Sequence, residues 1–184
     1  MNITQEIERV AAEADCLYTE DQVDAAIDRM AEAITARLAD QNPLVLSVLN
    51  GGILPTARLL LKLRFPLEID SIKAGRYQGA TQGEAALRWQ HQPDTPLKDR
   101  AVLLVDDVLD EGITLAELRR WCLEQGAASA HIAALVDKDL GRNKPCRADF
   151  TGLVAENRYL FGYGMDYKGY LRNWPGIYAC AKVY

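Results

Sequence analysis

Residues 101–118 read AVLLVDDVLDEGITLAEL. The first five residues, Ala101 to Val105, form an uncharged, branched run that is typical of a strand buried on both faces. Asp106 and Asp107 follow directly, so carboxylates gather at the carboxyl end of this strand. Beyond Gly112, apolar residues recur at helical spacing. The segment therefore predicts a strand, an acidic loop and the N-terminus of a helix.

This loop combines two features with opposite preferences for a ligand. A glycine before a helix start offers free backbone N–H groups and a favourable dipole to phosphate. Carboxylates repel phosphate, because like charges 4 Å apart cost about 1 kcal/mol in water and about 4 kcal/mol in a partly buried site. Carboxylates instead accept hydrogen bonds from hydroxyls and bind Mg²⁺. A phosphorylated sugar that carries a metal-bound pyrophosphate satisfies both features.

The composition restricts the class of protein. A chain of 184 residues with 49% hydrophobic residues is long enough for one domain with a substantial core. The net charge of −5 argues against a general nucleic-acid binder. The N-terminus has no signal-peptide core and no window resembles a membrane span, so we expect a cytoplasmic protein. The four cysteines are scattered and only two histidines occur, which excludes a zinc motif and favours reduced cysteines.

Outside the acidic stretch, strands alternate with helices. A capping box at Thr19 and an apolar stripe predict a helix over roughly residues 20–40. Strands are expected at residues 44–49, 67–73, 101–105 and 129–136. A glycine turn at residues 50–52 precedes a further helix from Ile53. From Phe150 onward the chain is aromatic and turn-rich, which favours a small flap over the sheet rather than another crossover.

This alternation indicates an α/β fold in a single domain over residues 1–184. Right-handed βαβ crossovers give a mainly parallel sheet, and such sheets bind ligands at the carboxyl ends of their strands. The glycine turn and the acidic loop therefore open on the same edge and can face one ligand. Residues 74–93 form a long polar segment that favours a lid, with a plain surface loop as the alternative.

The segment from Asp106 to Thr114 resembles the 5-phosphoribosyl-1-pyrophosphate (PRPP) motif of the type I phosphoribosyltransferases. That motif has a hydrophobic strand, two acids, two apolar residues, Asp, any residue, Gly, any residue and Thr, in that order. The alternative is an unrelated acidic metal site in a doubly wound domain, such as a phosphatase. Lys138 and the run RYLFGYGMDY at residues 158–167 narrow the resemblance to the hypoxanthine-guanine phosphoribosyltransferase family. The resemblance extends from Leu44 to Arg172.

The resemblance implies the type I phosphoribosyltransferase fold, with a twisted, mainly parallel sheet flanked by helices. The core would span about residues 20–140, and the terminal segments, about 1–19 and 141–184, would build a small hood. Residues 74–93 would form a mobile loop that closes over PRPP, with Arg76 and Tyr77 as its contact residues. Family members also use Mg²⁺ and assemble as homodimers or homotetramers. We therefore expect Mg²⁺ as the cofactor and a homodimer or homotetramer, with no nucleic acid or membrane partner.

The resemblance further implies transfer of the phosphoribosyl group from PRPP to hypoxanthine or guanine, which gives IMP or GMP and pyrophosphate. Asp110 would be the general base at purine N7. PRPP would be bound by Asn50, Gly51, Asp106, Asp107, Asp110, Glu111, Gly112, Ile113, Thr114 and Arg172. Asn50 stands where the family usually has a basic residue.

The purine would be bound by three residues beyond the acidic loop. Lys138 would donate to the purine O6, Tyr159 would stack on the ring, and the backbone of Leu160 would recognise its edge. Asp166 would bind a second Mg²⁺, and Asp106 and Asp107 would reach metal through ribose hydroxyls or water. Two alternatives stay open at this point: a regulator of the same fold that senses PRPP or nucleotides and binds RNA, and an enzyme that prefers xanthine.

Overall fold

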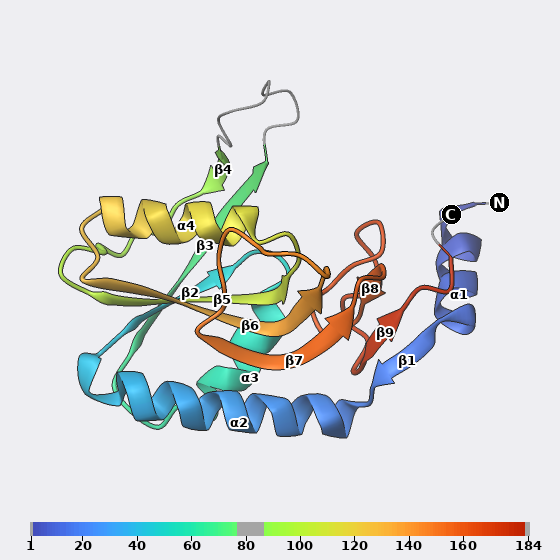
Figure 1. The fold of residues 1–184 in the computed structure, drawn as a ribbon, viewed down its shortest axis with the longest axis horizontal. Coiled ribbons are helices and arrows are strands. Elements are labelled where there is room, and N and C mark those ends of the chain that lie inside the picture. Colours follow the sequence, from blue (N-terminus) through green and yellow to red (C-terminus); the bar gives the residue numbers. More distant parts are fainter. Residues whose placement is uncertain (1, 77–86, 183–184) are drawn as a thin grey trace.

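The computed structural model describes residues 2–76 and 87–182, which form a six-stranded sheet, a three-stranded sheet and the helices that pack on them (Figure 1). In chain order the elements are α1 (Ile3–Glu13), β1 (Asp15–Tyr18), α2 (Glu20–Leu38), η1 (Ala39–Gln41), β2 (Leu44–Val48), α3 (Ile53–Leu60), β3 (Glu68–Arg76), β4 (Leu87–His91), β5 (Ala101–Leu109), α4 (Ile113–Glu124), β6 (Ser129–Asp139), β7 (Phe150–Glu156), β8 (Leu160–Phe161) and β9 (Ile177–Ala179).

The large sheet has the strand order β4-β3-β2-β5-β6-β7, and every neighbouring pair except β3 with β4 is parallel. Helices α2 and α3 cover one face and α4 covers the other (Figure 1). Residues 101–105 of β5 are buried, as the branched run predicted, because helices cover both faces of this central strand. The prediction of a mainly parallel α/β fold is confirmed.

Strand β5 is longer than the sequence predicted. It continues through Asp106 and Asp107 to Leu109, so placing these two carboxylates in the loop was wrong. The neighbouring β6 explains the difference, because it continues alongside and pairs Asp106 with Ala134 and Val108 with Val136. Both carboxylates therefore project from a regular strand rather than from a flexible loop.

Helix α2 forms where the sequence predicted a helix. The Thr19 side chain caps the backbone of Gln22, whose side chain in turn accepts from the Thr19 N–H. The helical stripe of apolar residues is fully inside, with Ile27, Ile34 and Leu38 at 0% exposure. The helix thus buries its apolar face against one face of the large sheet.

Strand β7 contradicts the prediction that everything after Phe150 forms a flap. Residues 150–156 pair in parallel with β6 and extend the large sheet instead of joining the hood. The connection from β6 to β7 contains no helix, so the sequence lacks the pattern that usually marks a parallel crossover. The Asp149 carboxylate holds this edge, because it accepts from the backbone N–H of Ile132 at 2.9 Å and pairs with Arg119.

Strands β3 and β4 form an antiparallel arm at the other edge of the sheet, so the long-loop prediction was wrong for residues 74–76 and 87–91. Side-chain packing stabilises β4, since the centroid of the Trp89 ring lies 4.8 Å from that of the Trp121 ring of α4. Tyr77 and the rest of the segment to residue 86 lie outside the described residues, so the lid prediction stays a prediction.

The hood is built from the two terminal segments, but its C-terminal part is shorter than the predicted residues 141–184, because β7 belongs to the large sheet. Strands β1, β9 and β8 form the small sheet, and both ends of the chain lie on this side of the molecule (Figure 1). The sequence did not predict α1, which starts with a capping box at Asn2. Its residues Ile7 and Val10 pack in one apolar cluster with Tyr167, whose hydroxyl donates to Glu6 at 2.9 Å. Helix α1 therefore anchors the C-terminal segment.

The four cysteines form no disulfide, in agreement with the expectation of reduced thiols. Within residues 2–76 and 87–182, no helix combines the length and the apolar character that crossing a membrane requires.

We expect Leu104→Ala in β5 to lower the free energy of unfolding by about 2–5 kcal/mol, because the fully buried side chain would leave a cavity against α4. Urea unfolding monitored by circular dichroism measures the change. The control Leu123→Ala alters a half-exposed residue of α4 and should cost far less. A loss below about 0.5 kcal/mol at Leu104 would contradict the central placement of β5.

Candidate active site

A cavity of about 760 Å³ opens where β2, β5 and β6 end. The predicted site residues that line it are Asn50, Gly51, Asp106, Asp107, Asp110, Glu111, Gly112, Ile113, Thr114, Lys138, Tyr159, Leu160, Asp166 and Arg172. Segments that lie far apart in the sequence thus meet in one place, as a parallel sheet requires. Arg76 ends β3, and Tyr77 lies outside the described residues, so their assignment to a closing loop is untested.

Two adjacent carboxylates form the floor of the cavity. Asp107 is 7% exposed, whereas Asp106 is partly open to the cavity and accepts from the Asp107 backbone N–H at 2.9 Å. Burial raises the pKa of Asp106 well above its ordinary value, and the nearby charge of Asp107 adds to this effect. Burial also raises the pKa of Asp107 to about 6, although Arg172 opposes the shift. Such carboxylates are poised to accept hydrogen bonds from a ligand or to bind a cation.

The glycine turn reaches the floor because it has no side chain there. A Cβ on Gly51 would lie 2.1 Å from the Asp107 carboxylate, and the peptide between Leu49 and Asn50 is cis. Gly164 closes on the same turn from the other side, since its Cβ would lie 2.2 Å from the Gly51 carbonyl oxygen. With φ at +108°, Gly164 also has a backbone conformation that favours glycine. These close approaches bring backbone groups of residues 50–51 to the ligand space.

The predicted helix N-terminus also faces the cavity. Gly112 is the N-cap of α4 with φ at +79°, and as a glycine it has no side chain that could cap the first N–H groups of the helix. Gly112, Ile113 and Thr114 line the cavity at this end. Free N–H groups, the helix dipole and a threonine hydroxyl together suit a phosphate group.

Lys138 and Tyr159 also line the cavity. The Lys138 ammonium is 2.9 Å from the Asp110 carboxylate, and its side chain is 10% exposed while that of Asp110 is 51% exposed. Tyr159 is 40% exposed and meets the buried Tyr167 edge-on at 5.4 Å between ring centroids. A donor and an exposed aromatic face in one cavity suit a flat, polar-edged ring such as a purine.

Arg172 links the floor to the hood. Its guanidinium lies 2.6 Å from Asp166, 3.9 Å from Asp107, and donates to the Gly164 carbonyl at 2.6 Å. Asp166 also accepts from the Gly169 N–H at 2.6 Å. One cation therefore sits between two cavity carboxylates, where it can also meet an anionic ligand.

The described residues contain no group of three or more His, Cys, Asp or Glu side chains arranged to hold a metal ion. This donor set still fits Mg²⁺, because that ion usually takes one or two carboxylates together with substrate phosphates and water. Asp106, Asp107 and Asp166 supply such oxygens along one cavity. The raised pKa values on the floor indicate carboxylates that a cation would stabilise.

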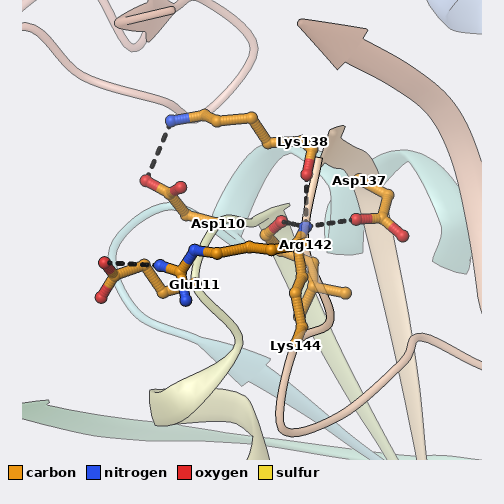
Figure 2. Close-up of polar contacts among 7 residues, drawn as sticks. Asp110, Glu111, Asp137, Lys138, Arg142 and Lys144 are labelled. Atoms are coloured by element: carbon orange, nitrogen blue, oxygen red, sulfur yellow. Dashed lines mark hydrogen bonds and ion pairs between the residues drawn. The ribbon is translucent and has the colours of Figure 1, made fainter. Parts of the chain in front are cut away.

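Sequence reasoning missed several polar residues at this site. Arg142 and Asn157 line the cavity, and Arg142 lies 3.5 Å from Glu111 (Figure 2). Lys144 lies two residues after Arg142, and its ammonium contacts the Asp137 carboxylate. Both basic residues lie in the coil between β6 and β7, which has no periodicity, and the only signal was their closeness in sequence to Lys138.

Comparison with known proteins defines the class. A family model described as the phosphoribosyl transferase domain matches residues 14–168. Together with the parallel sheet and the acidic loop before α4, this match makes the chain a phosphoribosyltransferase domain of type I.

Individual relatives narrow the assignment. The hypoxanthine-guanine phosphoribosyltransferase of Streptococcus pneumoniae is 34% identical over 161 residues, which cover 88% of this chain and 89% of that protein. The hypoxanthine-guanine-xanthine phosphoribosyltransferase of Tritrichomonas foetus is 35% identical over 162 residues, 88% of each chain. A solved hypoxanthine-guanine-xanthine phosphoribosyltransferase structure has a TM-score of 0.83 at 31% identity and covers 91% of this chain and 97% of its own. The chain belongs to the hypoxanthine-guanine phosphoribosyltransferase family.

The raised pKa of Asp107 predicts how stability depends on pH. The folded state holds this proton up to about pH 6 while the unfolded state releases it near 3.8, so stability should fall as pH rises through that window. In metal-free buffer, Asp107→Asn should therefore gain roughly 1–3 kcal/mol of unfolding free energy over wild type at pH 8, and much less at pH 4. Urea unfolding at both pH values measures this, and an equal difference at both would refute the pKa assignment.

Proposed function

We propose that this protein is a purine-salvage enzyme that transfers the phosphoribosyl group of PRPP to hypoxanthine or guanine. The observation that carries the proposal is that one cavity contains Lys138 and Tyr159 together with the acidic strand end and the free helix N-terminus. A site for a purine and a site for a sugar phosphate are thus joined. As in the family, we expect the enzyme to act as a homodimer or homotetramer.

Each part of PRPP has a matching group in the cavity. Asp106 and Asp107 would accept hydrogen bonds from the ribose hydroxyls, and residues 111–114 would bind the 5′-phosphate through backbone N–H groups and the Thr114 hydroxyl. The backbone of Asn50 and Gly51, with the Arg172 guanidinium, would face the pyrophosphate. Asp166 would hold Mg²⁺, with Asp106 and Asp107 reaching it through ribose hydroxyls or water; when bound, the ion offsets charge on the pyrophosphate.

In the transfer, purine N9 bonds to ribose C1 while the bond from C1 to the pyrophosphate oxygen breaks. Asp110 would take the proton that leaves purine N7, and its half-exposed carboxylate lies on the cavity wall where a base can meet it. In the structure this carboxylate pairs with Lys138, so one contact positions both side chains before substrate binds.

Base preference follows from hydrogen-bond pairing. Lys138 can only donate, and hypoxanthine, guanine and xanthine present an oxygen at position 6 whereas adenine presents an amino group. An unpaired buried donor is costly, which disfavours adenine. The relatives include enzymes named for hypoxanthine and guanine and enzymes also named for xanthine, so xanthine belongs in the assay.

We expect pyrophosphate release when the protein is mixed with PRPP, Mg²⁺ and either hypoxanthine or guanine, and no release above background with adenine. A coupled pyrophosphate assay and chromatography of IMP and GMP measure both products, with xanthine as a further arm. Removing Mg²⁺ with a chelator should abolish turnover. Lack of turnover with every base would refute the proposed function, and a clear preference for xanthine would correct the substrate.

We expect Asp110→Asn to lower kcat by about 10²–10⁴-fold, because the amide cannot take the N7 proton. PRPP binding, measured by calorimetry, should change little, because the variant keeps the size and the oxygen that Lys138 contacts. Asp21→Asn, in the exposed first turn of α2, is the matched control and should leave kcat unchanged. A kcat within twofold of wild type for Asp110→Asn would contradict its role as the base.

A further inference from the structure

Lys144 lies behind the cavity wall in the coil that connects β6 to β7. Its side chain is 10% exposed, and it is not among the described residues that line the cavity. Its ammonium donates to the Leu109 carbonyl at 2.7 Å, to the Asp137 carboxylate at 2.6 Å and to the Lys138 carbonyl at 2.5 Å (Figure 2). An ammonium has three N–H donors, so this one is fully used by groups of two strands.

The three acceptors of the Lys144 ammonium lie at the ends of β5 and β6. Backbone pairing between β5 and β6 ends at Leu109 opposite Asp137, so the ammonium holds the two strands together where their own hydrogen bonds stop. Leu109 directly precedes Asp110, and Lys138 directly follows Asp137. The side chains of Asp110 and Lys138 meet 2.9 Å apart just beyond this point. A single cation thus fixes the backbone on both sides of that pair.

The same coil also supports the loop before α4. The Lys144 Cβ would lie 3.4 Å from a Cβ on Gly112, and the thiol of Cys146 donates to the Gly112 carbonyl at 3.2 Å. Removing the ammonium would take the cation from the partly buried Asp137 carboxylate and one donor from each of two carbonyl oxygens. The strand ends would then rearrange to reach water or other donors.

We propose that Lys144 is a positioning residue that sets the relative placement of Asp110 and Lys138, and so aligns the proton acceptor and the O6 donor on one purine. This inference rests on the proposed function. Lys144 does not touch substrate, and its effect passes through the backbone of residues 109 and 138. Such an effect can be large, since a displacement of about 1 Å in an active site can cost about 10²-fold in rate.

The first test needs no substrate. Lys144→Met keeps the length of the side chain and removes the three donors. Hydrogen exchange should become faster at the backbone amides of residues 109–114 and 137–140, and remain as in wild type in α2. Lys62→Met is the matched control, because Lys62 pairs with Asp28 on the opposite side of the sheet and should leave both segments unchanged. Unchanged exchange in Lys144→Met would overturn the inference.

The second test is a double-mutant cycle with Lys138→Met. For hypoxanthine, kcat/KM of Lys144→Met should fall about 10²-fold at a temperature where the variant is fully folded, whereas Lys62→Met should retain wild-type values. In the Lys138→Met background the same substitution should cost less than about threefold, because contacting or coupled residues are not additive. The inference would be overturned if Lys144→Met alone lowered kcat/KM less than twofold. It would also be overturned if the losses of the two substitutions were additive, because Lys144 would then be a merely structural residue.

Two further outcomes are distinguishable. If Lys144→Met fails to fold, Lys144→Arg takes its place, since a planar guanidinium retains the charge but cannot bring three donors to one point. It should show a smaller loss with the same coupling to Lys138→Met, and additivity would again refute the inference. A wild-type protein without any turnover would refute the proposed function, and hydrogen exchange alone would then decide whether Lys144 orders the two strand ends.

Discussion

The site depends on one buried carboxylate, that of Asp107, around which the segments of the cavity are packed. Gly51 approaches it only because it has no Cβ, Gly164 packs on Gly51 for the same reason, and the Arg172 guanidinium lies 3.9 Å from the carboxylate. Asp106 lies at the same strand end, so the two carboxylates repel each other unless a bound ligand or a proton neutralises part of their charge. The acids of β5 and the start of α4 thus occupy different places: Asp106 and Asp107 lie on the floor, and Glu111, beside the N-terminus of α4, lies 3.5 Å from the Arg142 guanidinium.

Much of the fold and the position of the acidic segment at a strand end could be predicted because they follow from local pattern. The branched run before Asp106 marks the central strand, and the Thr19 capping box marks the start of α2. In a parallel sheet, strand ends share one edge, so the glycine turn at residues 50–52 and the acidic segment had to meet. Lys138 and Tyr159 came instead from the family resemblance, since a lysine near a strand end or a tyrosine in an aromatic run carries no such signal by itself.

The parts that could not be predicted depend on the path of the chain rather than on its pattern. Strand β7 follows a helix-free connection, and its place in the sheet is fixed by long-range contacts such as that of Asp149 with Ile132. Lys144 acquires its role only because that same coil folds back over the ends of β5 and β6. Neither its spacing nor its neighbours in sequence indicate three acceptors. A residue in irregular structure takes its function from geometry that periodicity does not encode.

The pairing of β1 with β9 has a consequence for the order in which the protein is made. A ribosome that has released the chain through β7 has delivered every strand of the large sheet, and that sheet can assemble from neighbours that follow one another closely. The hood cannot, because its first strand must wait for its last. Tyr159, Asp166 and Arg172 all come late in the chain, so the acidic floor is synthesised and can be enclosed by helices before the wall that completes the cavity exists.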